Sequence, residues 1–214
     1  MTDLRSMHET VLAASKELND RGLVEGSSGN LSARIDENHV CMTPSSIPYD
    51  DMVLDDLVVV DLDGNVVEGD KGPTSEKALH LACYRRYPEI GGVIHSHAVY
   101  ATMFAVAREP IPAAIEEVAV YIGGDVPVAD YTMTGTDELG EEVASRLGDR
   151  AAVLVANHGM VTVGPTLEKA LHAARLVERT AQIVFGARLL GKVHDIPAEV
   201  NENFGNVYKL MRGV

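Results

Sequence analysis

Apolar residues recur every three or four positions in several segments of the chain, the spacing of one face of a helix. The segments that this spacing predicts to be helical are 3–21, a stretch from GPTS (72–75) to the residue before Pro88, 98–107, a stretch that begins at Thr136, and one from Thr166 to about Gly191. Their ends carry helix signals, because Gly22 stops the first helix and Thr74 or Ser75 is placed to cap the second.

Short runs rich in β-branched residues predict strands between these helices. They are 39–43, 57–61, 66–68, 91–97, 118–122, 126–131, 151–157 and 160–164. Turn sequences join two pairs of them into hairpins, LDGN at 62–65 and HG at 158–159. Because strands and helices do not strictly alternate, we expect a three-layer α/β fold with a mostly antiparallel central sheet flanked by helices, in a single domain over residues 1–214.

The charge of the chain narrows its partners. Its 32 acidic and 18 basic residues give a net charge of −14, whereas a nucleic-acid binder needs a basic face. No apolar run approaches the roughly 18 residues of a membrane span, and the N-terminus lacks the apolar stretch of a secretory signal. The two cysteines, Cys41 and Cys83, give no disulfide framework. We therefore expect a cytoplasmic protein without nucleic-acid or membrane partners.

The triplet HSH at 95–97 is the most informative motif. Residues two apart on a strand point to the same face, so His95 and His97 are expected to aim their imidazoles at one point. His158 ends another apolar run, and Gly159 lets the chain turn sharply there. One histidine at a strand end is usually a polar cap, but three imidazoles with an open fourth position are the pattern of a catalytic zinc.

Several short motifs occur in order along the chain: GNLS (29–32), TPSS (43–46), EGDKGPTSE (68–76), VIHSHA (93–98) and NHGMV (157–161). In this order and at these intervals they resemble the class II aldolase/adducin family, and within it the aldolases that cleave L-fuculose 1-phosphate. The likeness runs over residues 12–190, nearly the whole chain. It implies the fold of that family, a zinc site and a sugar-phosphate substrate.

The resemblance also implies roles for single residues. It places zinc ligands at His95, His97 and His158, and the catalytic glutamate at Glu76, which also binds the zinc when no substrate is present. Tyr208 stands where the family has a C-terminal Tyr that protonates the aldehyde. The phosphate pocket falls on small or hydroxyl-bearing residues: Gly29, Asn30, Ser45, Ser46, Thr74 and Ser75. Such residues let N–H and O–H groups approach an anion, and a helix N-terminus favours it further.

Three positions near the expected substrate depart from the family pattern. Family members often carry Gly where Ser46 stands. In the fuculose enzymes aromatic residues shape the aldehyde pocket, whereas here Glu116 or Glu117 and Thr134 occupy the corresponding positions. These changes point to a different aldehyde. His80 follows Glu76 by four residues, and we expect it to be a packed or exposed helix residue rather than a neighbour of the site.

The implied reaction is cleavage of a ketose 1-phosphate into dihydroxyacetone phosphate and an aldehyde through a metal-stabilised enediolate. One Zn²⁺ per subunit is expected, with Mn²⁺ or Co²⁺ as substitutes, since imidazole sites accept several metals. The family's site lies between the subunits of a tetramer, so we expect a homotetramer.

Other activities stay open at this point. Relatives in the family include L-ribulose-5-phosphate 4-epimerases, which usually carry Asp where Glu76 stands, and methylthioribulose-1-phosphate dehydratases. Adducin-like binding modules lack the metal ligands, which are all present here. An unrelated zinc hydrolase would satisfy the histidines but would leave the phosphate motifs unexplained.

Overall fold

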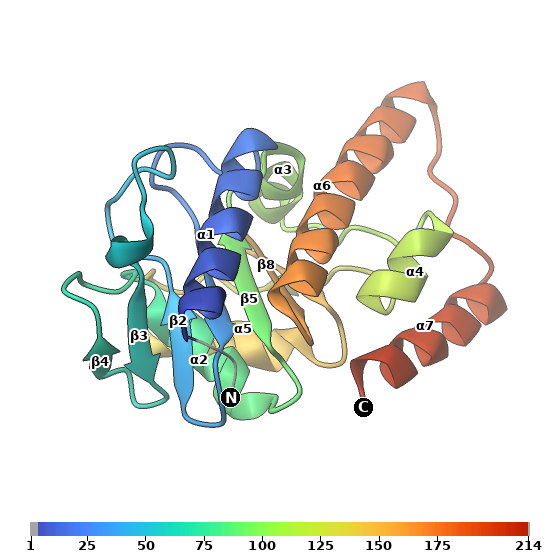
Figure 1. The fold of residues 1–214 in the computed structure, drawn as a ribbon. Helices are drawn as coiled ribbons and strands as arrows, with labels where there is room; N and C mark the ends of the chain where they lie inside the picture. Colours follow the sequence, from blue (N-terminus) through green and yellow to red (C-terminus); the bar gives the residue numbers. More distant parts are fainter. Residues whose placement is uncertain (1–3, 214) are drawn as a thin grey trace.

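A computed structural model describes residues 4–213 and contains an 8-stranded sheet in the order β4-β3-β2-β1-β5-β8-β7-β6 (Figure 1). The strands are β1 (Asn30–Arg34), β2 (His39–Met42), β3 (Val58–Asp61), β4 (Val66–Glu68), β5 (Gly92–Ser96), β6 (Val128–Ala129), β7 (Ala152–Val155) and β8 (Gly159–Gly164). Neighbouring strands are antiparallel except β6 and β7, which are parallel. The mostly antiparallel sheet that the sequence predicts is therefore confirmed.

Helices cover both faces of the sheet. They are α1 (Leu4–Asp20), α2 (Lys77–Arg86), α3 (Val99–Ala107), α4 (Glu116–Ile122), α5 (Asp137–Leu147), α6 (Leu167–Leu190) and α7 (Ala198–Arg212), with a short 3-10 turn, η1 (Leu54–Asp56). α1, α3 and α6 lie on one face, while α2 and α5 pack together on the other (Figure 1). Neighbouring residues along a strand point to opposite faces and enter different hydrophobic cores. Ile94 lies in the core beneath α1, α3 and α6, whereas Val93 lies in the core beneath α2 and α5.

The central strand β1 is absent from the sequence prediction, because Gly and Ser surround it and polar residues alternate within it. The alternation has a purpose in the structure. Leu31 and Ala33 belong to the core under α1, whereas Asn30 and Ser32 are buried on the opposite face of the strand. There both side chains form hydrogen bonds with the side chain of His80 on α2. A strand that buries polar residues lacks the hydrophobic signal by which strands are recognised.

Two of the predicted strands differ in the structure. Residues 118–122 form the end of helix α4, and the strand predicted at 126–131 shortens to β6. A short apolar run does not distinguish a strand from a helix by itself. Two features favour the helix here: the carboxylates of Glu116 and Glu117 in its first turn, and the burial of Val118, Ala119 and Ile122 on one side.

The helices predicted from the sequence are confirmed. Thr136 and Thr166 cap α5 and α6, because their hydroxyls accept the N–H groups of Leu139 and Lys169 at 3.2 and 3.3 Å. The first helix is described from Leu4 onward. Its predicted first residue, residue 3, lies outside the described residues, as do residues 1, 2 and 214. Within residues 4–213 no helix combines the length and apolar character that crossing a membrane requires.

The C-terminal segment, for which the sequence predicts neither a helix nor a strand, forms α7 and packs against α4. Arg212 holds the end of this helix to the rest of the fold. Its guanidinium donates to the carboxylate of Glu89 at 3.0 Å and to the carbonyl oxygens of Gly148 and Arg150 at 3.2 and 2.7 Å.

Candidate metal and anion site

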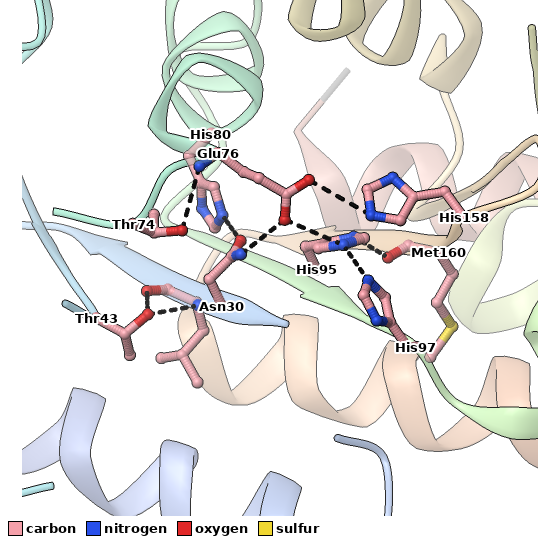
Figure 2. Close-up of polar contacts among 10 residues, drawn as sticks. Asn30, Thr43, Thr74, Glu76, His80, His95, His97, His158 and Met160 are labelled. Carbon is pink, nitrogen blue, oxygen red and sulfur yellow. Dashed lines mark hydrogen bonds and ion pairs between the residues drawn. The ribbon is translucent and has the colours of Figure 1, made fainter. Parts of the chain in front are cut away.

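Strand β5 carries the first two histidines. His95 pairs with Asn30 of β1 and Val161 of β8, and its side chain is fully buried. Its Nδ1 donates to the carbonyl oxygen of Met160 at 3.0 Å, so its Nε2 carries a lone pair that faces the site. His97 follows directly after the strand, and its Nε2 lies 2.9 Å from Nε2 of His95 (Figure 2). The convergence predicted from the spacing is present.

The third histidine, His158, comes from the turn between β7 and β8. The residue before it, Asn157, has a φ of 58°, a left-handed conformation in which Asn is enriched. The residue after it must be small, because a Cβ on Gly159 would lie 2.4 Å from the carbonyl oxygen of Ser96. The three histidine rings have centroids 4.6, 4.8 and 4.9 Å apart. Their ligand atoms all lie within 4.8 Å of one another.

The environment favours the neutral form of His95 and His97. Burial lowers the pKa of His95 well below its ordinary value, and the neighbouring His158 and His97 lower it further. Burial also lowers the pKa of His97, again with a contribution from His158. A neutral imidazole is the form that binds a metal, so no proton has to be displaced from His95 or His97 when a cation enters.

Glu76 brings a carboxylate to the same point. The residue is 8 % exposed. Its Oε2 lies 3.3 Å from Nε2 of His95, and its Oε1 lies 3.5 Å from Nε2 of His158. The amide nitrogen of Asn30 donates to Oε2 at 2.9 Å (Figure 2). The carboxylate is thus held beside the histidines by one neutral donor.

The predicted cap of the helix that follows is wrong. Glu76 itself is the N-cap residue of α2, and no side chain caps the helix. Its carboxylate is turned toward the histidines and Asn30 instead of its own helix. The hydroxyl of Thr74 accepts the N–H group of Glu76 at 3.3 Å, one residue ahead of the helix. This hydrogen bond fixes the backbone at Glu76 and thereby the direction in which its side chain points.

These residues fit a bound transition metal. The lone pair of His95 Nε2 points at Nε2 of His97 across 2.9 Å, a contact that needs a proton or a cation between the two atoms. Among residues 4–213, Oε1 of Glu76 is a buried oxygen without a hydrogen-bond partner. Three imidazoles and a carboxylate are ligands that suit Zn²⁺ and related divalent ions. His95, His97 and His158 would hold the ion, with Glu76 beside it.

A polar hollow borders the histidines. Glu76 and His97 form one part of its wall. The rest of the wall includes every residue that the resemblance implies for a phosphate pocket: Gly29, Asn30, Ser45, Ser46, Thr74 and Ser75. Among the described residues that line it, none is Lys or Arg. An anion there would be bound by hydroxyls, N–H groups and the metal.

Two loops form this hollow by pairing edge to edge. The N–H group of Ser45 donates to the carbonyl oxygen of Gly72 at 2.9 Å, and that of Thr74 donates to Thr43 at 3.1 Å. Gly29 closes the third side, where a Cβ would lie 2.8 Å from the carbonyl oxygen of His95. The sequence motifs around 29, 45 and 74 therefore meet at one place, and they do so beside the metal ligands.

Other predicted residues lie elsewhere in the chain. Tyr208 is on α7, where its ring packs against Gly123 at the end of α4, and burial raises its pKa to about 12. Glu116, Glu117 and Thr134 are exposed. None of these four residues lines the polar hollow, as far as residues 4–213 define it.

Sequence reasoning missed the contacts behind Glu76. His80, expected to be an ordinary helix residue, is fully buried and bonded to Asn30. Ser32 and Tyr84 complete the same group. A weak signal was available, because His80 stands one helical turn after Glu76 and Ser32 stands two residues after Asn30, the spacings that share a face in a helix and in a strand.

Comparison with known proteins agrees with this geometry. Residues 9–185 match the family described as Class II Aldolase and Adducin N-terminal domain. A 5-methylthioribulose-1-phosphate/5-deoxyribulose-1-phosphate aldolase of Escherichia coli O45:K1 is 38 % identical over 189 residues, 88 % of this chain and 87 % of the relative. An L-ribulose-5-phosphate 4-epimerase of Salmonella paratyphi C is 37 % identical over 198 residues, 86 % of each chain.

Among solved structures, an L-fuculose 1-phosphate aldolase superposes with a TM-score of 0.92. It is 36 % identical in sequence, and the match covers 98 % of both chains. These relatives share the scaffold but differ in their named substrates, and one of them is named as an epimerase.

Proposed function

Because the chain belongs to the class II aldolase and adducin family, we propose that it is a zinc-dependent aldolase. Its substrate is a ketose 1-phosphate, L-fuculose 1-phosphate or a related sugar phosphate, which it cleaves into dihydroxyacetone phosphate and an aldehyde. The observation that carries this proposal is the position of Glu76, which lies between the three histidines and the hydroxyl-lined hollow. A metal, a proton carrier and an anion pocket thus share one site.

His95, His97 and His158 would hold the metal, which when bound would supply a Lewis-acid charge to stabilise the negative charge left on the carbonyl side when the carbon–carbon bond breaks. His95 and His97 are prepared for this by their depressed pKa values, since they reach the site as neutral ligands. The Met160 carbonyl fixes the ring of His95, so that only its Nε2 is presented.

Glu76 is proposed to move the proton. In cleavage the C4 hydroxyl releases its proton as the C3–C4 bond breaks and the aldehyde forms, and Glu76 delivers a proton to C3. In synthesis Glu76 removes that proton from dihydroxyacetone phosphate. Its Oε2 is held by Asn30, while its Oε1 has no hydrogen-bond partner among the described residues. One oxygen is thus anchored and the other is available for the proton.

The phosphate is proposed to bind in the hollow. Gly29 allows close backbone approach, Ser45, Ser46, Thr74 and Ser75 offer hydroxyls, and α2 begins directly behind them. With the phosphate there, the reacting carbons of a short sugar lie toward Glu76 and the histidines, on the same wall of the hollow. This fits a ketose 1-phosphate, in which the phosphate and the reacting carbons are close in the chain.

Assembly belongs to the same proposal. Tyr208 does not reach the hollow of its own chain, so its proposed contact with the aldehyde requires the site of another subunit. We therefore propose a homotetramer with sites at subunit interfaces. Cys41 and Cys83 are free and buried, in keeping with the reducing cytoplasm that we propose as its location.

The competing activity is epimerisation of L-ribulose 5-phosphate, because one relative of similar identity carries that name. The glutamate at position 76, where family epimerases usually have Asp, favours cleavage. A panel assay separates the two. Metal-loaded protein is incubated with L-fuculose 1-phosphate, 5-deoxyribulose 1-phosphate, methylthioribulose 1-phosphate and L-ribulose 5-phosphate, and the products are identified by NMR.

We expect dihydroxyacetone phosphate and an equal amount of aldehyde from at least one 1-phosphate, with activity lost on chelation and restored by Zn²⁺. A pentulose epimer without dihydroxyacetone phosphate would refute the aldolase assignment. Loss of water from methylthioribulose 1-phosphate would assign the chain to the dehydratases of the family instead.

A further inference from the structure

A buried histidine beside the site has no part in the reaction described above. His80 lies on α2, one turn after Glu76, and its side chain is 0 % exposed. Its Nε2 lies 2.6 Å from Oδ1 of Asn30, and its Nδ1 lies 2.6 Å from Oγ of Ser32. Both ring nitrogens are thus bonded to residues of strand β1 (Figure 2 shows the contact with Asn30).

The direction of each hydrogen bond follows from the carboxylate. The amide nitrogen of Asn30 lies 2.9 Å from Oε2 of Glu76, so its NH₂ group donates to the carboxylate. The Oδ1 of Asn30 then faces His80 and accepts, which places the ring proton on Nε2 of His80. The Nδ1 of His80 is left bare and accepts the hydroxyl proton of Ser32. One tautomer of His80 satisfies every contact.

The hydrogen bonds continue beyond Ser32 to Tyr84. Tyr84 lies one turn further along α2 and is fully buried. Its hydroxyl is 2.9 Å from the carbonyl oxygen of Ser32 and 3.0 Å from Oγ of Ser32. These contacts form a relay of hydrogen bonds that runs through Tyr84, Ser32, His80, Asn30 and Glu76. The relay connects α2 with β1, and Ser32 and His80 in its middle are fully buried.

We propose that His80 is a positioning residue for Glu76, which it orients by holding the amide of Asn30 with its nitrogen toward the carboxylate. The role of Glu76 rests on the proposed function, whereas the relay does not. Without the Nε2–H donor, the amide of Asn30 is free to turn its oxygen to Glu76. Two oxygen acceptors would then repel, and Glu76 would lose the bond that anchors its Oε2.

Burial supports this role. It lowers the pKa of His80 to about 3, and the neighbouring His95 lowers it further, so the ring stays neutral across the working pH range. A neutral ring donates from one nitrogen only. A charged ring would donate from both and would lose the bond from Ser32, which breaks the directional order of the relay.

Two substitutions separate positioning from simple packing. In His80→Gln the side-chain amide reaches the place of Nε2 and can still donate to Asn30. In His80→Asn the shorter amide takes the place of Nδ1 and meets Ser32 but not Asn30. Tyr87→Phe is the matched control, since it removes a hydroxyl at the end of the same helix that donates to the carbonyl oxygen of Ala144, away from the site.

We expect His80→Asn to lower kcat by about 10- to 100-fold, the range found for residues that orient a metal site, with KM within about threefold and bound metal unchanged. His80→Gln should stay within about fivefold of the wild type in kcat, and Tyr87→Phe should match the wild type. Equal losses in the Asn and Gln variants would show that His80 acts by packing alone and would overturn the proposal, as would wild-type kcat in His80→Asn.

A measurement without substrate covers the case in which the variants fail to fold. Nitrogen-15 NMR of histidine-labelled wild-type protein, with and without Zn²⁺, reports the tautomer of His80. The proposal expects the proton on Nε2 and no change between pH 5 and 8. A proton on Nδ1 would overturn it. Because this readout needs no activity, it stands even if the panel assay rejects the aldolase assignment.

Discussion

Ser46 has a backbone conformation that its side chain disfavours. Its φ is 65°, in the left-handed region, and it lines the polar hollow beside Ser45. An L-residue with a Cβ pays roughly 1 kcal/mol or more there, and Gly does not. Gly at this position would relieve the strain, in keeping with the Gly that the family pattern often has there.

Glycine should therefore be better tolerated at position 46 than at position 45. Ser46→Gly removes the left-handed strain, while Ser45→Gly adds only chain entropy to the unfolded state. Both variants lose the same contact between the two hydroxyls, 3.2 Å apart. We expect the free energy of unfolding in urea to be higher for Ser46→Gly than for Ser45→Gly by about 1 kcal/mol. A less stable Ser46→Gly would contradict the strain.

The metal ligands are the part of the site that single residues predict well. The spacing of His95 and His97 on a strand fixes their common direction, whatever the fold around them. The contact between Asn30 and Glu76 is different, because it joins residues 46 apart in the sequence and depends on how α2 lies over β1. His80 was expected to be a packed or exposed helix residue and is packed, but its contact with Asn30 was not predicted, since a helix pattern does not say which polar neighbour a buried face meets.

The turn between β7 and β8 is the element on which the histidine geometry depends most. Gly159 sits where a Cβ would lie 2.4 Å from the Ser96 carbonyl oxygen and 2.9 Å from Cδ2 of His97. The carbonyl belongs to the central strand β5 and cannot move without breaking its pairing with β8. A methyl group at this position must therefore push the turn, and His158 with it, away from the other two ligands.

Gly159→Ala should accordingly lose bound Zn²⁺ and become less stable, by about 2 kcal/mol or more as for other overpacked sites. Gly186→Ala is the control: Gly186 lies in helix α6 with open space at its Cβ position, and alanine there should stabilise by about 0.5–1 kcal/mol. Metal analysis and urea unfolding measure both. Full zinc occupancy in Gly159→Ala would show that the turn does not control the site.

At the level of elements, the sequence predicts those whose apolar pattern is clear. The long helix α6 and the hairpin of β7 and β8 have regular patterns, and both are confirmed. The prediction fails at β1, where the buried face is polar, and at α4, where the run of five apolar residues at 118–122 fits the spacing of a strand as well as that of a helix. In both cases the deciding contacts come from distant segments, α2 for β1 and α7 for α4.

The whole molecule exposes apolar side chains at the ends of its last two helices. Leu189 and Leu190 on α6 are 75 % and 93 % exposed, and Leu210 on α7 is 81 % exposed. Large exposed aliphatic groups of this kind favour burial against another copy of the chain. We expect light scattering after size-exclusion chromatography to give about four times the subunit mass of 23.0 kDa. Active protein at the mass of one subunit would refute the tetramer.

The proposed proton transfer at C3 of a bound triose phosphate, by Glu76 beside a metal held by three histidines, can be measured directly. Dihydroxyacetone phosphate is incubated with the protein in D₂O, without any aldehyde, and the hydroxymethyl protons are followed by NMR. We expect one hydroxymethyl hydrogen to exchange with solvent in the presence of the Zn²⁺-loaded wild type. Exchange should be lost on chelation, and Glu76→Gln should lower it by about 100-fold or more while the metal stays bound. Absence of exchange in the metal-loaded wild type, or undiminished exchange in Glu76→Gln, would show that Glu76 and the metal do not move this proton.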